Sequence, residues 1–332
     1  MSATLSVVIP VYNEEAGLAA LFERLYPELD KLGRQYEVIF VDDGSSDRSV
    51  ALLREQFQRR PDVTRVVVLA RNAGQHMAIL AGFAQTRGDH VVTLDADLQN
   101  PPEEIAKILV QMDEGADYVG TIRARRHDVY WRKAASRLMN RIRERTTQIS
   151  ITDQGCMLRG YHRSIVEAIN RCLEVSTYVP ALGYTFARHP VEIEVAHAER
   201  KAGESKYSLY RLIRLNFDLM TGFSVAPLQF FTMAGTALAV LSLLFVLFLA
   251  IRRLVVGPEA EGVFTLFGIA FFLIGVLLVG LGVVGEYVGR IYEQVRQRPR
   301  YTIAAVLEEV DGGSRETTQR MHVIPGQLER HS

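Results

Sequence analysis

The first 200 residues alternate between two hydrophobic patterns. Short runs rich in valine, isoleucine and leucine are typical of buried strands, and longer stretches with apolar residues every three or four positions are typical of amphipathic helices. Strands and helices that alternate at this spacing predict βαβ units, and hence an α/β fold with a Rossmann-like, mostly parallel sheet covered on both faces. The expected strands are Leu5–Ile9, Glu37–Val41, Arg65–Leu69, His90–Leu94 and Tyr118–Thr121, and the expected helices are about Glu15–Leu32, Asp47–Arg59, Gln75–Thr86 and Pro102–Glu114.

Two long apolar runs follow this domain. Leu228–Ile251 and Gly262–Gly285 each comprise 24 residues without a charged side chain. As helices they would each be about 36 Å long, whereas the hydrocarbon core of a bilayer is about 30 Å thick. The alternative is a buried helical hairpin in a soluble core. Because only Arg252–Glu261 separate the two runs, we predict a membrane hairpin.

The topology follows from the chain ends and from the even number of spans. Met1–Val11 shows no basic start followed by a long apolar core, so we expect the first domain in the cytoplasm and both termini on that side. Arg252 and Arg253 between the runs oppose the positive-inside trend, and four arginines after the second run obey it. We expect a polar, mobile end from Asp311. The expected parts are a domain at 1–205, a juxtamembrane helix at 206–226, a membrane hairpin at 227–286 and a C-terminal segment at 287–332.

Charge and cysteine content exclude two classes of protein. The 332 residues include 38 basic and 38 acidic side chains, which argues against a protein that coats nucleic acid. Cys156 and Cys172 are too few for a disulfide scaffold, and no Cys/His cluster has the spacing of a zinc site.

Three of the expected strands end in unusual polar clusters, which lie at Pro10–Glu15, Asp42–Asp47 and Asp95–Pro102. In open α/β sheets, ligands bind at the carboxyl ends of the strands. A helix start would equally explain Ser45–Asp47, as caps of the next helix, and Pro101–Glu103. It does not explain Asp95 and Asp97, which precede the cap and point to one side of an extended chain. Two carboxylates with a neighbouring amide oxygen suit Mg²⁺ or Mn²⁺, which could bridge the pyrophosphate of a nucleotide.

The stretches VVIPVYNEE, VDDGSSD and LDADLQNPPEEI, in this order and spacing, resemble family 2 glycosyltransferases with the GT-A fold. The resemblance to the polyprenyl-phosphate branch covers nearly the whole chain. It implies a UDP-sugar donor, undecaprenyl phosphate as acceptor, contact with membrane lipid and a bacterial inner-membrane location, and it is compatible with a homo-oligomer. RNAGQHMAILAGF, DEGADYVGTIR, DQGCMLRGY, HAERKAGESKYS and GEYVGRIYEQVRQRPRY are similar to the branch members that serve the aminoarabinose modification of lipid A, which implies 4-deoxy-4-formamido-L-arabinose as the sugar.

The resemblance also implies roles on the donor side. Asp97 and Gln99 would ligate the metal, with Asp95 nearer the donor ribose or a metal-bound water. Either Asp42 or Asp43 would accept hydrogen bonds from the uracil or the ribose. Arg71 could reach the base or a phosphate, although an exposed salt bridge explains it nearly as well. The residues expected to border the uridine pocket are Pro10, Tyr12 and Glu14.

A basic segment precedes the apolar runs. Residues 121–145 contain nine Lys/Arg against two acidic residues, a net charge of +7 over 25 residues. Around Trp131 a helix would align an apolar stripe beside arginines, which is typical of a helix on an anionic membrane; the alternative is a solvated charged face. Tyr207–Met220 would form a second interfacial helix. The resemblance assigns contacts with the acceptor phosphate to Arg123, Arg132 and Ser136. It assigns contacts with phosphates of either the donor or the acceptor to Arg200 and Lys206.

The mechanism follows from the acceptor that the resemblance implies. A phosphate monoester has a second pKa of about 6, so it is largely dianionic near neutral pH and already carries its nucleophilic oxygen. One in-line displacement would invert the anomeric configuration. The resemblance places Asp153 near the acceptor, where it would position groups or, as the alternative, act as a general base.

Rival functions remain as alternatives. Within the branch, the nearest one is a glucosyl- or mannosyltransferase that uses the same lipid. From another class, a transporter or non-catalytic membrane scaffold is disfavoured, because the spans offer no polar pathway and a scaffold does not require Asp95, Asp97 and Gln99. Gly280–Gly285 fits the pattern GxGxxG but lies inside an expected span, so we do not interpret it as a dinucleotide site.

Overall fold

The computed structural model divides into two compact units, which we describe separately. The first unit comprises residues 1–134, 149–206 and 298–332, and the second comprises residues 135–148 and 207–297. The structure describes residues 4–123, 151–153, 155–172, 178–196, 225–256, 263–296, 298–310 and 313–317.

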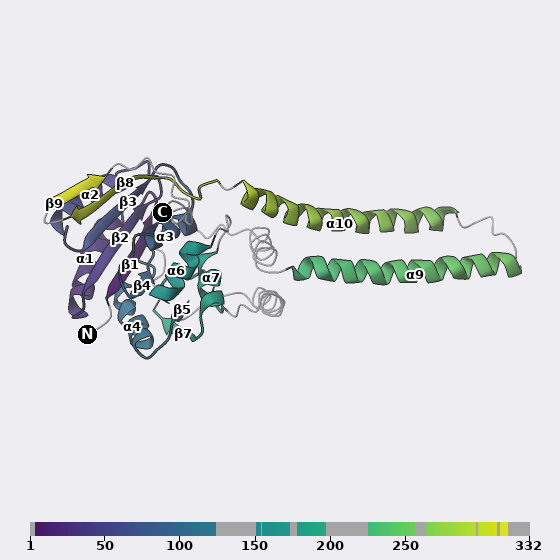
Figure 1. Cartoon of the computed structure of the whole chain (residues 1–332), viewed down its shortest axis with the longest axis horizontal. Helices are drawn as coiled ribbons and strands as arrows, with labels where there is room; N and C mark the ends of the chain where they lie inside the picture. The colour runs from purple at the N-terminus through teal and green to yellow at the C-terminus, as the bar shows by residue number, and fades with distance from the viewer. Residues whose placement is uncertain are drawn as a thin grey trace, which may run out of the picture. The chain divides into compact units, whose positions relative to one another are not determined.

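The first unit is built on one sheet, in which the described residues form nine strands in the order β7-β5-β6-β4-β1-β2-β3-β8-β9 (Figure 1). All five expected strands are confirmed. The sheet is mixed, however: β1 pairs in parallel with β2 and β4, whereas β6 runs antiparallel to β4 and β8 runs antiparallel to β3. The strands are β1 (Leu5–Val11), β2 (Tyr36–Asp42), β3 (Thr64–Leu69), β4 (His90–Thr93), β5 (Tyr118–Arg123), β6 (Arg159–His162), β7 (Pro190–Val195), β8 (Ile303–Val310) and β9 (Gly313–Thr317).

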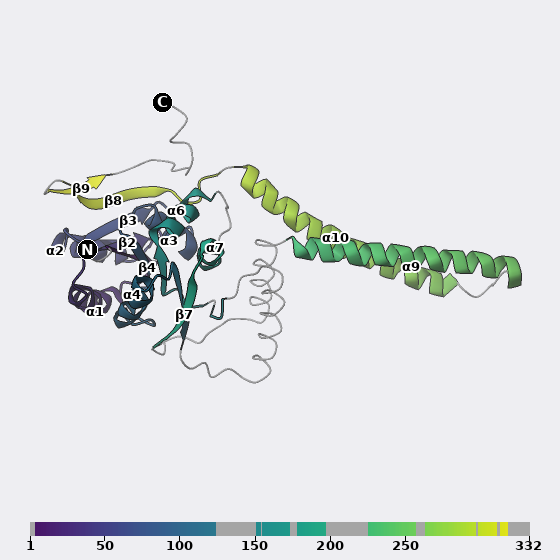
Figure 2. The ribbon, with the colours of Figure 1, turned by 60° about the horizontal axis from the view of Figure 1, so that its bottom comes forward.

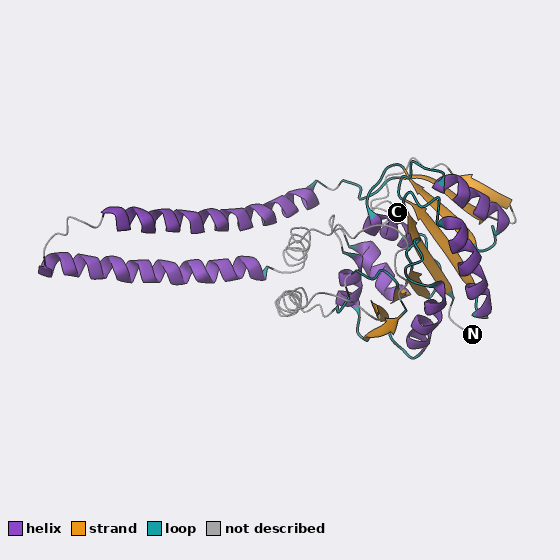
Figure 3. Cartoon of the chain, turned by 180° about the vertical axis from the view of Figure 1, so that it is seen from behind, coloured by secondary structure: helices purple, strands orange, loops and turns teal. Residues whose placement is uncertain are grey.

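Helices cover both faces of this sheet (Figure 3). One face of β1, with Val7 and Ile9, packs with α1, α2 and α4 in the main core. On the other face, Gly82 of α3 lies against Val8, where any side chain would collide with the valine. The four expected helices are confirmed, the last of them as a 3₁₀ turn that continues into α4. The helices are α1 (Leu18–Lys31), α2 (Ser49–Arg59), α3 (Gln75–Phe83), η1 (Pro102–Glu104), α4 (Ile105–Asp113), α6 (Arg163–Arg171) and α7 (Val179–Phe186).

The C-terminal part of the chain returns to this sheet (Figure 2). Ile303 and Leu307 of β8 are buried, and β8 pairs with β3, more than 230 residues earlier in the chain. The sequence pattern did not reveal β8. The expectation of a mobile end from Asp311 is wrong for Gly313–Thr317, which pair with β8 as β9. The reason is that the edge of β3 offers unpaired backbone groups, which a distant segment can satisfy.

The second unit contains the two long helices α9 (Ala226–Val256) and α10 (Val263–Val295). They coincide with the two apolar runs; α9 extends beyond its run at both ends, and α10 extends beyond its run at the C-terminal end. Within the described residues, one stretch, Ile269–Val295, is long and apolar enough to cross a membrane, and an 18-residue window within it has a mean hydropathy of 2.4. Many of its large apolar side chains are exposed, such as Phe271 at 70%. Membrane insertion of both helices stays a prediction.

Candidate active site

The loops after β1 and β2 are joined by hydrogen bonds at the carboxyl end of the sheet. The backbone N–H of Asn13 donates to Oγ of Ser45 (2.9 Å), and the backbone N–H of Ser46 donates to Oδ1 of Asn13 (2.8 Å). Asp47 accepts a hydrogen bond from the backbone N–H of Ser49 at the start of α2 (2.9 Å). This agrees with the alternative that Asp47 stabilises the start of this helix. The first two polar clusters are therefore joined into one connected set of loops at this edge of the sheet.

The side chains expected to border the uridine pocket lie along the end of β1, between the ends of β2 and β4. Tyr12 is 49% exposed, whereas Pro10 and Glu14 are half-buried. An exposed aromatic ring at the end of a central strand offers a flat apolar surface, which a planar base can stack on.

Asp42 and Asp43 are both buried, but they have different partners. Asp43 accepts hydrogen bonds from the backbone N–H groups of Ala73 (2.7 Å) and Gly74 (2.9 Å), so it holds the loop after β3. Oδ2 of Asp42 accepts from two backbone N–H groups of the following turn, at 3.1 Å each. Oδ1 of Asp42 is buried without a hydrogen-bond partner in the described part of the chain. Burial raises the pKa of both carboxyl groups.

Arg71 begins the loop that Asp43 holds. Its side chain is exposed, and within the described residues it makes no ion pair, so the exposed salt bridge offered as its alternative role is not observed. The backbone of this loop lies against Gly44, which has a φ of 70° and whose Cβ, if present, would be 2.6 Å from the backbone N of Asn72. Only glycine fits this turn, which brings the loops after β2 and β3 together.

The third polar cluster follows β4. Oδ1 of Asp95 accepts a hydrogen bond from Nε2 of Gln75 (2.7 Å), and Oδ2 accepts from Nδ2 of Asn100 (3.4 Å). Asp97 accepts from the backbone N–H of Gln99 (3.1 Å), which turns the chain sharply after the carboxylate. Two side-chain amide groups therefore hold Asp95, whereas Asp97, among the described residues, accepts a hydrogen bond only from its own turn.

These residues fit a divalent cation. Burial, followed by the neighbouring carboxylate of Asp97, raises the pKa of Asp95 to about 7. Two carboxylates that repel each other in a partly buried site are stabilised by a hard cation, and carboxylate and amide oxygens are the ligands it prefers. Among the described residues, no three His, Cys, Asp or Glu side chains gather around one point. A cation held by Asp97 and Gln99 would therefore need further oxygens from a substrate.

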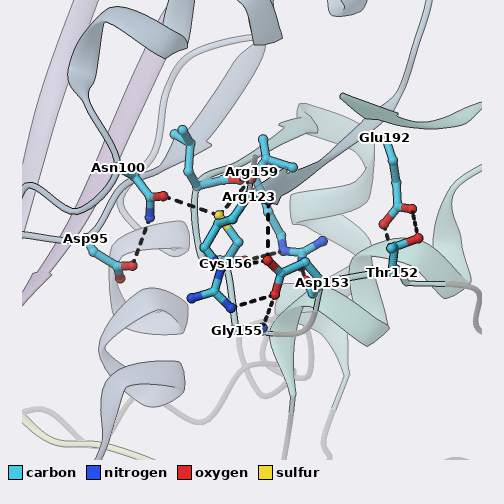
Figure 4. Close-up of polar contacts among 11 residues, drawn as sticks. Asp95, Asn100, Arg123, Thr152, Asp153, Gly155, Cys156, Arg159 and Glu192 are labelled. Carbon is cyan, nitrogen blue, oxygen red and sulfur yellow. Dashed lines mark hydrogen bonds and ion pairs between the residues drawn. The ribbon is translucent and has the colours of Figure 1, made fainter. Parts of the chain in front are cut away.

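Arg123 and Asp153, which sequence analysis placed on the acceptor side, contact each other directly (Figure 4). Nε and Nη2 of Arg123 donate to the two carboxylate oxygens of Asp153, at 2.6 and 2.8 Å. The backbone N–H of Gly155 donates to the same carboxylate (3.0 Å). Asp153 raises the pKa of Arg123, so the guanidinium stays charged. The planar fork of this arginine is thus held in one orientation at the end of β5.

Sequence reasoning missed the residues that link Asp95 to the segment 153–156. Sγ of Cys156 donates to Oδ1 of Asn100 (3.4 Å), whose amide nitrogen donates to Asp95. Thr121 of β5 lies 2.9 Å from the same sulfur. Arg159 of β6 is fully buried and donates to backbone carbonyls of this segment. No sequence motif reveals these contacts, because each joins residues from different elements.

The remaining acceptor-side predictions fall outside the described residues. This applies to the basic segment beyond Arg123 and to the interfacial helix expected at Tyr207–Met220. It also applies to four of the five predicted phosphate-binding residues, Arg132, Ser136, Arg200 and Lys206.

The chain is similar to known proteins along almost all of its length. The family model described as glycosyl transferase family 2 matches residues 6–169. A protein of Edwardsiella ictaluri named undecaprenyl-phosphate 4-deoxy-4-formamido-L-arabinose transferase is 51% identical over 91% of this chain and 94% of its own. A protein of the same name from Pseudomonas aeruginosa is 50% identical over 96% of this chain and 94% of its own.

Among solved structures, glucosyl-3-phosphoglycerate synthase from Mycobacterium tuberculosis, in complex with Mn²⁺, UDP and glucosyl-3-phosphoglycerate, matches with a TM-score of 0.47. It is 20% identical, and the match covers 66% of this chain and 78% of the synthase.

Proposed function

The chain belongs to glycosyltransferase family 2, and we propose that it transfers 4-deoxy-4-formamido-L-arabinose from its UDP conjugate to undecaprenyl phosphate. This proposal rests on sequence identity: over more than nine-tenths of its length, the chain is about 50% identical to relatives whose names state this activity. The product would serve the aminoarabinose modification of lipid A and hence resistance to cationic peptides.

On the donor side, we assign the base or ribose contact to Asp42 rather than Asp43. Both oxygens of Asp43 are engaged by the loop after β3, whereas Oδ1 of Asp42 has no partner in the described chain. A buried acceptor without a donor is unfavourable, and an N–H or O–H of the nucleoside would satisfy it. Pro10, Tyr12 and Glu14 border the same pocket. Arg71, exposed at the loop that Asp43 holds, is placed to reach a phosphate.

Asp97 and Gln99 would hold Mn²⁺ or Mg²⁺, with Asp95 beside them toward the donor. When bound, the cation would neutralise negative charge that develops on the departing UDP. Asp95 cannot reorient freely, because Gln75 and Asn100 hold its two oxygens. We therefore propose that Asp95 has a structural role and keeps the loop after β4 in place beside the donor.

On the acceptor side, Arg123 would contact the lipid phosphate, together with Arg132, Ser136, Arg200 and Lys206. The phosphate oxygen is itself the nucleophile, so the site needs alignment and charge neutralisation more than a base. Asp153 supports this assignment, because both of its oxygens are occupied by Arg123. It positions the guanidinium, and a single in-line displacement inverts the anomeric centre.

The role of Arg123 is tested by binding and turnover together. Arg123→Ala should keep affinity for the UDP-sugar in calorimetry and lose transfer to lipid. Arg163→Ala, at an exposed arginine of α6 with its own ion pair to Glu167, is the control and should change neither. Loss of donor binding in Arg123→Ala would place this arginine on the donor side instead.

The helices α9 and α10 would anchor the enzyme in the bacterial inner membrane as a hairpin. The apolar side chains that α9 and α10 expose, such as Phe230 at 76% and Phe271 at 70%, need an apolar environment, which lipid supplies. The two crossings would return the chain to the cytoplasmic side. This agrees with β8 and β9, which follow α10 and complete the sheet of the catalytic unit.

The sugar assignment is tested by the products of the purified full chain in lipid, supplied with undecaprenyl phosphate and a panel of UDP-sugars. Mass spectrometry should find the 4-deoxy-4-formamido-L-arabinosyl lipid, with the highest specificity constant for that donor. A formamido group offers a donor and an acceptor, so a site built for it should reject a plain hydroxyl firmly. A higher specificity constant for UDP-glucose, or for a mannosyl donor, would overturn the sugar assignment.

A further inference from the structure

Arg159 is a charged side chain in an unusual place. It stands at the start of β6, it is fully buried, and it is the largest of the fully buried side chains among the described residues. Within the part of the chain that the structure describes, no carboxylate lies within 4 Å of its guanidinium. Burying an arginine without an acidic partner is unfavourable, so the hydrogen bonds that it makes instead indicate its role.

The guanidinium is hydrogen-bonded on three sides (Figure 4). Nε donates to the backbone oxygen of Cys156 (2.9 Å), and Nη2 donates to the backbone oxygen of Asp153 (2.5 Å). Nη1 donates to the phenol oxygen of Tyr118 (2.6 Å). Two of the three acceptors therefore belong to the backbone of one segment, residues 153–156, which we call the 153–156 loop. The fork of one arginine joins both ends of this loop.

The 153–156 loop carries side chains that face the proposed site from two directions. At its start, the carboxylate of Asp153 accepts two hydrogen bonds from the guanidinium of Arg123 and so holds it. At its end, the thiol of Cys156 donates to Asn100, which donates to Asp95. Hydrogen bonds weaken quickly as they lengthen, so a small shift of the loop backbone would disturb both sets of contacts. Arg123 would be affected most directly, because Asp153 of the loop contacts it without an intermediate residue.

We propose that Arg159 is a positioning residue, which holds the 153–156 loop so that Asp153 aims Arg123 at the acceptor phosphate. This inference rests on the proposed acceptor role of Arg123. The alternative is that Arg159 only fills space in the core. An apolar side chain would fill that space without the cost of a buried charge, but it could not bind two loop carbonyls.

The test compares Arg159→Lys with Arg163→Lys in the full chain, in lipid, in a Cys172→Ala background. Lysine keeps the charge at position 159 but cannot reproduce the fork, whereas Arg163 is an exposed arginine four residues away. Two quantities are measured: the rate at which a maleimide labels Cys156, and the kinetic constants for each substrate. Labelling reports the order of the loop whatever the reaction is, because Cys156 is buried.

In Arg159→Lys we expect Cys156 to be labelled at least about tenfold faster, and kcat/KM for the acceptor to fall by at least about tenfold. The KM for the UDP-sugar should stay within about twofold, and Arg163→Lys should match the parent protein. Unchanged labelling would overturn the role of Arg159, whichever substrate Arg123 binds. Faster labelling with a defect confined to the donor would instead overturn the acceptor assignment of Arg123.

A second variant keeps the inference testable if Arg159→Lys does not fold. In Gly155→Ala, the new Cβ would lie 2.5 Å from Nη2 of Arg123, so the arginine must move while Arg159 keeps its bonds. This variant should show the acceptor defect with Cys156 still protected. Parent-like acceptor kinetics in Gly155→Ala would refute the coupling between the loop and Arg123.

Discussion

Replacing Asp153 by asparagine removes one charge from a buried ion pair while keeping the size of the side chain. The Arg123 side chain is 17% exposed and that of Asp153 is 5% exposed, so water compensates little for the loss. Removing one partner of a buried pair costs about 3–5 kcal/mol, and we take about 3 kcal/mol because asparagine keeps one acceptor oxygen. For a catalytic unit of roughly 200 residues, this lowers the apparent Tm by about 6–12 °C.

The assay is a thermal unfolding scan of the full chain in detergent, with Glu103→Gln as the control. Glu103 also accepts hydrogen bonds from Nε and Nη2 of one arginine, Arg24, but those two side chains are 42% and 41% exposed. An exposed pair contributes under about 1 kcal/mol, so the control should shift the Tm by no more than about 4 °C. An equal shift in Asp153→Asn and Glu103→Gln would refute the argument from burial.

The same variant separates the two roles considered for Asp153. If it only positions Arg123, transfer should fall by about 100-fold at every pH. The acidic limb of the pH–rate profile should then stay near the second pKa of the acceptor phosphate, about 6, in both the variant and the parent protein. An acidic limb that moves or vanishes in Asp153→Asn would identify the carboxylate as a general base.

Three further predictions concern the metal and the hairpin. Asp97→Asn should reduce transfer by about 100-fold or more, and EDTA should abolish transfer by the parent protein; full activity in EDTA would exclude a metal role. Gly280→Ala should lower the apparent Tm, because its Cβ would collide with Phe231 of α9, whereas Gly282→Ala, with open space around it, should not. Equal shifts in the two variants would contradict this packing. A cysteine at Glu259 should be labelled from the periplasmic side of intact cells, and labelling only after lysis would overturn the topology.

Local patterns in the sequence determined the central strands, the helices between them and the two long apolar helices. Whether a segment forms a strand or a helix depends mainly on which positions are apolar, and neighbouring residues carry that information. The carboxylates of Asp42, Asp43, Asp95 and Asp97 were found for the same reason. Asp42 ends β2 and Asp43 follows it, Asp95 and Asp97 come shortly after β4, and the ends of parallel strands meet at one edge of a sheet.

Contacts between distant segments were decided only by the tertiary structure. Asp42 and Asp43 are adjacent and chemically identical in the sequence, but the structure gives them different partners: Asp43 accepts from two N–H groups of the loop after β3, whereas Asp42 accepts from two N–H groups of the turn after β2. In the sequence, Arg159 is an ordinary arginine. Its role depends on the position of β6 between β4 and β5, where its guanidinium is hydrogen-bonded to the 153–156 loop and to Tyr118. Hydrogen bonding and burial depend on which segments meet in space, and that is a property of the whole fold.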